Sequence, residues 1–172
     1  GDTIYAVIRG IGASSDGKGK GITAPNPTGQ KLALERAYKN SGLSSQSVEL
    51  IECHGTSTIV GDKVEVDTLR TFLEQETRKT PVRIGSVKSN IGHLKSAAAA
   101  ASIIKTALAI YHKTLPPTAN YKQPRKDLEL GVLKVQTEVE PWNTPNRRAG
   151  VSAFGFGGTN FHMCMESVPT TP

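Results

Sequence analysis

The chain has 172 residues, of which 37% are hydrophobic and 21% are charged, and this balance fits one globular domain or a large piece of one. The net charge of +6 permits a polyanionic partner, but lysines and arginines are scattered among acidic residues, so a basic nucleic-acid module is the weakest functional alternative. The alanine-rich run between Lys95 and Lys105 is much shorter than the roughly 20 residues of a bilayer span, which argues against a membrane protein.

Strand-like and helix-like patterns alternate along the chain. In chain order, we expect a strand at 3–10, a flexible loop at 14–21, a helix from 28 to 42, a strand at 48–53, a helix from 61 to 73, a strand at 82–87, a helix from 92 to 112, and strands at 132–135, 148–153 and 160–165. This alternation predicts an α/β layered architecture.

The two cysteines, Cys53 and Cys164, lie in apolar, strand-like stretches. The sequence contains neither a CxxC pair nor a secretory leader. We therefore expect a reducing cytoplasm rather than a disulfide framework.

The stretch SVKSNIGHLKSAAAAAS places His93 at the expected start of the helix 92–112. Nearly every face of that helix between Lys95 and Lys105 is apolar, as in a helix enclosed on several sides. The positive end of a helix disfavours protonation, so we expect a neutral imidazole that can donate one N–H bond to an oxygen gaining negative charge. The alternative is a histidine without a catalytic role, whose own hydrogen bonds are satisfied near the start of a helix.

A second histidine follows the same pattern. His54 comes at the end of a strand, and the next helix begins a few residues later. Because the carboxyl ends of parallel strands meet at one edge of a sheet, His54 and His93 are expected to converge there. Thr56 and Thr58 can bond a polar ligand, and their alternative role is to cap the turn.

Two charged residues, Lys88 and Glu65, are expected near the same edge of the sheet. Lys88 stands at a strand end, where an ion-pair partner is the usual role, and Glu65 is its natural candidate. The alternative for Glu65 is a capping box with Asp62.

Between the last two strands, residues 152–160 (SAFGFGGTN) contain two aromatic residues, Phe154 and Phe156, and three glycines. Glycines allow a sharp turn whose exposed N–H groups can meet an anion. The strand–GxGxxG–helix context is missing, so a nucleotide-binding loop is not favoured.

Three motifs in register, HGTSTIVGDKVEV, SVKSNIGHLKSAAAAAS and FGFGGTN, resemble the C-terminal half of a β-ketoacyl synthase of the thiolase-like superfamily. The stretch VIRGIGASSDGKGKGITAPNPTGQ is closer to ketosynthase domains of polyketide and polyunsaturated-fatty-acid synthases than to stand-alone fatty-acid enzymes. The resemblance covers essentially the whole chain, so residues 1–172 are interpreted as one ketosynthase C-terminal half. It implies half of an αβαβα layered domain, with a mixed five-stranded sheet and helices on both faces.

The resemblance also implies roles for the charged residues. His54 and His93 correspond to the two histidines of a Cys-His-His centre, and Lys88 to its supporting lysine, held with Glu65. The family's nucleophilic cysteine belongs to an N-terminal half that is absent from this sequence. Neither cysteine of the chain has the strand-to-helix elbow that a nucleophile would use.

Thr56 and Thr58 resemble the threonines that bond a phosphopantetheine arm. Phe156 resembles a gating phenylalanine whose backbone N–H forms half of an oxyanion hole, with Phe154 beside it. The implied partners are the N-terminal ketosynthase half, an acyl carrier protein and a second copy of the complete domain in a homodimer. Neither a metal nor a cofactor of its own is expected, since the two histidines lack a third ligand in zinc spacing and the substrates are carried on phosphopantetheine.

The implied reaction is decarboxylative Claisen condensation of an acyl thioester with a malonyl-type thioester, in polyketide or fatty-acid synthesis. A non-catalytic partner of the chain-length-factor type is one alternative, although the retained histidines and Lys88 argue against it. A thiolase-type enzyme that uses acetyl-CoA without decarboxylation is the other, and the HGT and NIGH motifs argue against it.

Overall fold

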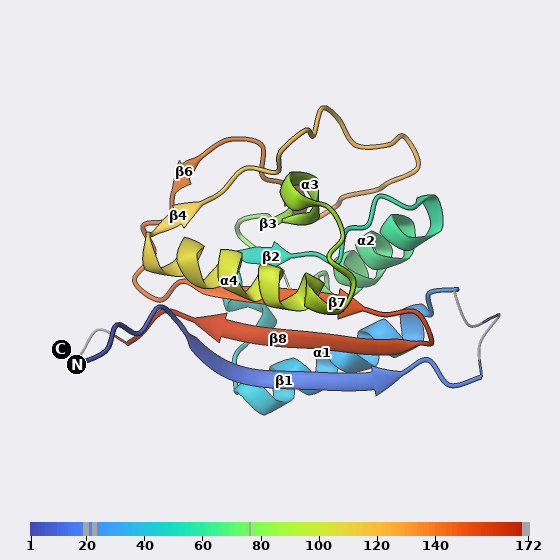
Figure 1. Cartoon of the computed structure of the whole chain (residues 1–172), viewed down its shortest axis with the longest axis horizontal. Coiled ribbons are helices and arrows are strands. Elements are labelled where there is room, and N and C mark those ends of the chain that lie inside the picture. Colours follow the sequence, from blue (N-terminus) through green and yellow to red (C-terminus); the bar gives the residue numbers. More distant parts are fainter. Residues whose placement is uncertain (19–20, 22–23, 76, 170–172) are drawn as a thin grey trace.

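The computed structural model of the chain describes residues 1–18, 21, 24–75 and 77–169. Within these residues, a six-stranded sheet has the order β1-β8-β7-β2-β3-β5, and β4 pairs with β6 in a small second sheet (Figure 1). The strands are β1 Val7–Ser15, β2 Leu50–Glu52, β3 Val82–Gly85, β4 Thr114–Leu115, β5 Leu133–Val135, β6 Glu140–Pro141, β7 Arg148–Phe154 and β8 Thr159–Glu166. The α-helices are α1 Pro27–Ser41, α2 Ile59–Leu73, α3 Lys88–Ile91 and α4 Ala98–Tyr111, with 3-10 turns at Ser45–Ser47 and Lys95–Ala97.

The large sheet is mixed, as predicted. β2 runs parallel to β3 and β7, β3 runs parallel to β5, and β8 is antiparallel to both β7 and β1. The predicted count of five strands is wrong by one, because β1 adds to the free edge of β8. β1 also covers 7–15 rather than 3–10, since its pairing with β8 continues to the register Ser15↔Thr159.

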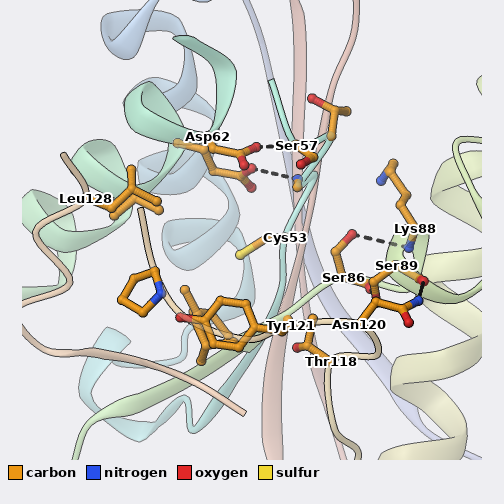
Figure 2. Close-up of a pocket in the computed structure, with 18 of the residues that line it drawn as sticks. Cys53, Ser57, Asp62, Ser86, Lys88, Ser89, Thr118, Asn120, Tyr121 and Leu128 are labelled. Atoms are coloured by element: carbon orange, nitrogen blue, oxygen red, sulfur yellow. Dashed lines mark hydrogen bonds between the residues drawn. The ribbon is translucent and has the colours of Figure 1, made fainter. Parts of the chain in front are cut away.

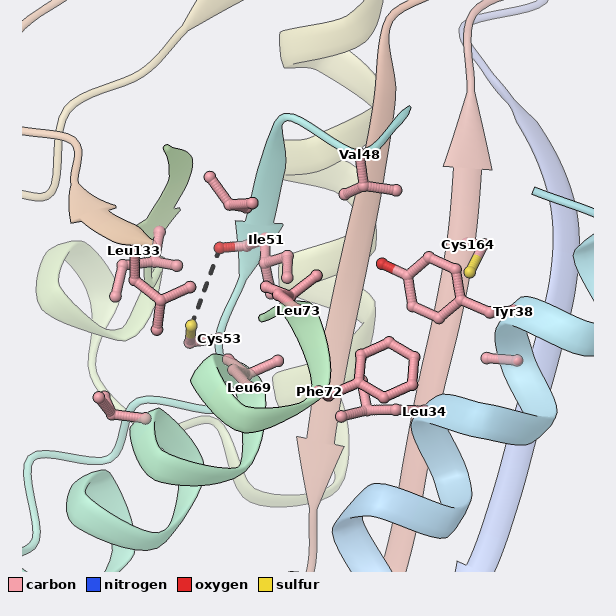
Figure 3. Close-up of a cluster of buried hydrophobic side chains, with 14 of the residues drawn as sticks. Leu34, Tyr38, Val48, Ile51, Cys53, Leu69, Phe72, Leu73, Leu133 and Cys164 are labelled. Atoms are coloured by element: carbon pink, nitrogen blue, oxygen red, sulfur yellow. Dashed lines mark hydrogen bonds between the residues drawn. The ribbon is translucent and has the colours of Figure 1, made fainter. Parts of the chain in front are cut away.

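Helices cover both faces of this sheet, also as predicted (Figure 1). Side chains of α1 and α2 form one core with β2, β3 and β8, where Leu34, Ile51 and Leu73 are fully buried (Figure 3). α4 packs on the opposite face, where Ile110 joins Trp142 in a second core. This layering leaves the carboxyl ends of β2, β3 and β7 at one edge of the sheet.

The predicted boundaries of α1 agree with its capping. The Asn26 side chain accepts the Thr28 N–H at 3.0 Å, and Gly42 ends the helix with a left-handed φ of 68°. The helix lies so close to β1 that a Cβ added at Gly10 would stand 2.8 Å from the carbonyl oxygen of Ala37.

We therefore expect Gly10→Ala to lower the free energy of unfolding by about 1–3 kcal/mol, because the added methyl group would force α1 away from β1. A denaturant titration of the protein measures this difference. Ala13→Ser is the control on the same strand, since Ala13 is exposed and its substitution should change stability by less than about 0.5 kcal/mol. Equal stabilities of the two variants would contradict this close packing.

The predicted continuous helix 92–112 is wrong in its first turns. The chain instead forms the short helix α3, breaks at Gly92 with φ 74°, makes a 3-10 turn that begins with Lys95 at φ 56°, and enters α4 at Ala98. Left-handed backbone at these two positions interrupts the helical hydrogen-bond ladder. His93 consequently lies in an exposed loop between two helical segments, and not at the start of α4.

Candidate active site

The two predicted histidines meet at the carboxyl edge of the sheet. The ring centroids of His54 and His93 lie 5.5 Å apart, with the ring planes at 88°. His54 follows β2 and is partly buried, whereas His93 is exposed on the loop after α3. The His93 Nδ1 accepts the backbone N–H of Lys95 at 3.0 Å, so its Nε2 is the nitrogen that carries the proton when the ring is neutral.

Both imidazoles favour the neutral form. Burial, followed by the positive charges of Lys88 and His93, lowers the pKa of His54 to about 4. Partial desolvation, followed by Lys88 and Lys95, lowers the pKa of His93. These lowered pKa values support the predicted neutrality, and the first cause at His93 is desolvation, followed by the charges of Lys88 and Lys95, whereas the prediction relied on a helix dipole.

Glu65 fixes the turn that carries His54. Glu65 belongs to α2 and is buried. Its carboxylate accepts the backbone N–H of His54 at 2.7 Å and that of Gly55 at 2.8 Å. Burial raises the pKa of Glu65 to about 7, although these two hydrogen bonds act in the opposite direction. Glu65 thus holds the backbone of the turn, where Gly55 has φ 44°.

Lys88 lies close to this turn without touching Glu65. The predicted ion pair between the two residues is not found among the described residues. Glu65 acts on Lys88 only through longer-range electrostatic attraction. Desolvation lowers the pKa of Lys88, while the negative charges of Glu65 and Glu52 oppose the shift. The lysine therefore adds positive charge beside both imidazoles.

The threonines of the turn have separate positions. Thr58 is the N-cap of α2, since its side chain accepts the Gly61 N–H at 3.2 Å, and the Thr56 hydroxyl lies 3.4 Å from that of Thr58. Asp62 accepts the N–H of Ser57 instead of forming a capping box with Glu65. The Thr56 side chain also lines the adjacent cavity.

The glycine turn, residues 155–158 between β7 and β8, begins close to His54 because Phe154 immediately precedes it. Phe154, the last residue of β7, is buried with its ring centroid 6.0 Å from that of His54. Phe156 stands at the outer end of the turn and is 84% exposed. The turn is closed by the Gly155 N–H, which donates to the Thr159 carbonyl at 2.8 Å.

A cavity of about 550 Å³ opens beside His93 and Lys88. Figure 2 shows the thiol of Cys53 directed toward its interior, with Asp62 and Lys88 on opposite sides and Tyr121 along the wall. Leu128, Leu130 and other apolar side chains also line it. The lining of the cavity therefore combines the charged groups of the site with apolar side chains.

The two cysteines are buried and free. Desolvation raises the pKa of both thiols, which disfavours the reactive thiolate. Neither residue stands on a strand-to-helix elbow. Among the described residues, no group of three or more His, Cys, Asp or Glu side chains is arranged to hold a metal, and no helix has the length and hydropathy of a membrane span.

One buried acid was missed by the reasoning from sequence. Glu52 is only 1% exposed and pairs with Lys105 of α4 at 2.7 Å. A signal for this pair existed, because Glu52 falls within the apolar strand predicted at 48–53 and Lys105 ends the apolar run of a helix that was predicted to be enclosed. Charged groups in the interior need partners of opposite charge, so Glu52 and Lys105 could have been assigned to each other.

Family comparisons agree with this fold and site. The family described as "Beta-ketoacyl synthase, C-terminal domain" matches residues 5–122, and the family described as "Ketoacyl-synthetase C-terminal extension" matches residues 123–172. The chain belongs to the β-ketoacyl synthase family, of which it carries the C-terminal domain and its extension, and it has the thiolase-like α/β fold.

Its relatives are polyketide and fatty-acid synthases. The chain is 46% identical to one of the phenolphthiocerol/phthiocerol polyketide synthase proteins of Mycobacterium tuberculosis, over 98% of this chain and 12% of that protein. It is 44% identical to a polyunsaturated fatty acid synthase protein of a Thraustochytrium species, over 96% of this chain and 6% of that protein. Among solved structures, the ketosynthase from module 6 of the bacillaene synthase of Bacillus subtilis matches with a TM-score of 0.92 and 42% identity, over 97% of this chain and 31% of that one. The chain thus spans a small part of each relative.

Proposed function

We propose that this chain forms part of a ketosynthase that performs decarboxylative Claisen condensation between an acyl thioester and a malonyl-type thioester. The observation that carries the proposal is the pair of neutral imidazoles, His54 and His93, whose ring centroids lie 5.5 Å apart beside Lys88. The similarity to polyketide and polyunsaturated-fatty-acid synthases supports the same assignment.

In the proposed reaction, the bond between the malonyl α-carbon and its carboxylate breaks and CO2 leaves. The electron pair passes to the thioester as an enolate, and its oxygen gains negative charge. N–H bonds from His54 and His93 stabilise that oxygen, because a donor that is already in place costs no reorganisation when the charge develops. The enolate carbon then attacks the acyl thioester carbonyl, a carbon–carbon bond forms, and the cysteine thiolate leaves.

The nucleophile in this scheme comes from outside the 172 residues. Both cysteines of the chain are buried with raised thiol pKa values, so neither suits acyl transfer. We assign the nucleophilic cysteine to an N-terminal ketosynthase half, which completes the centre formed by His54, His93 and Lys88.

The second substrate is proposed to arrive on the phosphopantetheine arm of an acyl carrier protein. Thr56 lines the cavity beside His93 and offers a hydroxyl to such an arm, with Thr58 next to it. Phe156 is well placed to gate entry, because its exposed side chain projects from the turn that begins beside His54. A homodimer of the complete domain and a reducing, cytoplasmic location belong to the same proposal, the latter supported by two free thiols.

The direct test is a product assay on the complete protein that contains this chain. Supplied with an acyl thioester and a carrier-bound malonyl thioester, it is expected to release one CO2 for each β-ketoacyl product, as measured by trapped CO2 and by mass spectrometry of the carrier. A complete protein that accepts acyl groups but neither decarboxylates nor condenses would instead be a non-catalytic partner.

A further inference from the structure

Glu52 and Lys105 form a charged contact that none of the proposed catalytic steps uses. The Glu52 carboxylate is 1% exposed, and its Oε2 lies 2.7 Å from the ammonium nitrogen of Lys105, whose side chain is 17% exposed. The other carboxylate oxygen accepts the backbone N–H of Val87, and the Ser102 hydroxyl lies 3.5 Å from that same oxygen. One acid therefore joins three segments of the chain: its own at the end of β2, the start of α3, and α4.

These segments carry the site. Glu52 stands two residues before His54, at the end of β2, and Val87 immediately precedes Lys88, which begins α3. Lys105 and Ser102 belong to α4, which packs against β7. A carboxylate that bonds the N–H of Val87 and the ammonium of Lys105 fixes the distance between the turn that carries His54 and the segment that carries Lys88.

A second buried carboxylate holds the same turn from the α2 side. Glu65 accepts the N–H groups of His54 and Gly55. Glu52 instead accepts the N–H of Val87, just before α3, and pairs with Lys105 of α4. Successive side chains of a strand point to opposite faces, so Glu52 reaches α4 while Cys53 points toward the α2 side. The His54 turn is thus held by a carboxylate on each side.

We propose that Glu52 and Lys105 are positioning residues of the ketosynthase site, which set His54 and Lys88 at their working separation by joining the ends of β2 and β3 to α4. This inference rests on the proposed condensation function. A charged pair suits this task because Glu52 is buried and Lys105 is largely shielded from solvent, so the pair has one favourable arrangement and its loss leaves a buried charge without a partner.

The test compares variants of the complete protein in the release of CO2 from a carrier-bound malonyl thioester. Glu52→Gln keeps an oxygen for the Val87 N–H but loses the charge that Lys105 needs. It is expected to lower kcat by about 10–100-fold and to change KM by less than about threefold, because misplaced donors weaken transition-state stabilisation rather than binding.

The matched control is Glu166→Gln. Glu166 is also a buried carboxylate with two cationic partners, Arg9 and Arg148, but it lies at the far end of β8 from the glycine turn. It is expected to lower the melting temperature about as much as Glu52→Gln does and to leave kcat within about twofold of the wild type. Equal losses of kcat in the two variants would reduce the Glu52 effect to general destabilisation and would overturn the inference.

A second pair of variants applies if Glu52→Gln does not fold. Lys105→Arg keeps the positive charge and is expected to retain kcat within about fivefold, whereas Lys105→Met is expected to lose about 10–100-fold. Wild-type kcat in both Lys105 variants would overturn the inference. A wild-type protein that releases no CO2 would overturn the proposed function, whereas an active wild type and an equally active Glu52→Gln variant would overturn the positioning role alone.

Discussion

Replacing His93 by alanine in the complete protein is expected to lower the rate of CO2 release from a malonyl thioester by about 10²–10³-fold, the usual cost of losing one oxyanion donor. Acyl loading of the nucleophilic cysteine should be retained far better. The reason is that the neutral His93 ring, exposed beside the cavity, is assigned to the enolate oxygen and not to the nucleophile. Radiolabelled acyl transfer, measured beside trapped CO2, separates the two half-reactions.

His112→Ala is the control for this experiment. His112 is also exposed, but it follows the C-terminal end of α4 and lies outside the site. Its replacement should leave both half-reactions within about twofold of the wild type. A His93→Ala variant that loses acyl loading and decarboxylation equally would show that the proposed division of labour is wrong.

The isolated 172-residue chain is expected to self-associate and to bind hydrophobic dyes strongly. α4 buries Ala98, Ser102 and Thr106 against the sheet, while its outward face exposes Ile104 at 60% and Leu108 at 41%. A helix that covers one face of a solvated sheet needs only one apolar stripe, so this second apolar face calls for a cover. We assign that cover to the N-terminal ketosynthase half.

Sedimentation and dye fluorescence measure this behaviour directly. Supplying the N-terminal half as a separate chain should relieve association, and Ile104→Glu with Leu108→Glu should relieve it without any partner. Lys134→Glu serves as a charge control on an exposed position of β5 and should leave the association unchanged. A monomeric isolated chain that binds no dye would contradict the need for a cover.

Much of the layered fold followed from local patterns. Asn26 and Pro27 mark the start of α1 and Gly42 marks its end. The predicted helix agrees with the observed one within a residue or two. Convergence of His54 and His93 followed from strand ends meeting at one sheet edge, which depends on topology more than on precise boundaries.

The errors have a different physical origin. The break between α3 and α4 depends on left-handed backbone at Lys95, and no residue pattern specifies such a conformation for a lysine. Both Glu65 and Glu52 accept backbone N–H groups, which the turns at His54 and Val87 bring close to them. Such backbone contacts depend on tertiary packing, whereas a sequence pattern indicates only side-chain partners, such as Lys105 for Glu52.

If neutral histidines stabilise the enolate, the pH dependence of kcat for CO2 release must follow the lowered pKa of His54. The folded protein holds the pKa of His54 at about 4, below the ordinary value of 6.5, so the ring stays neutral until the pH falls toward that lower value. We predict that protonation of His54 causes no loss of rate from about pH 8 down to about pH 5.5 and lowers the rate only as the pH approaches about 4, whereas a change near pH 7 is assigned to Glu65, whose pKa is raised to about 7. A decline with an apparent pKa near 6.5 that His54→Asn removes would show that the working imidazole has an ordinary pKa, and the proposed role of a neutral His54 would then be wrong.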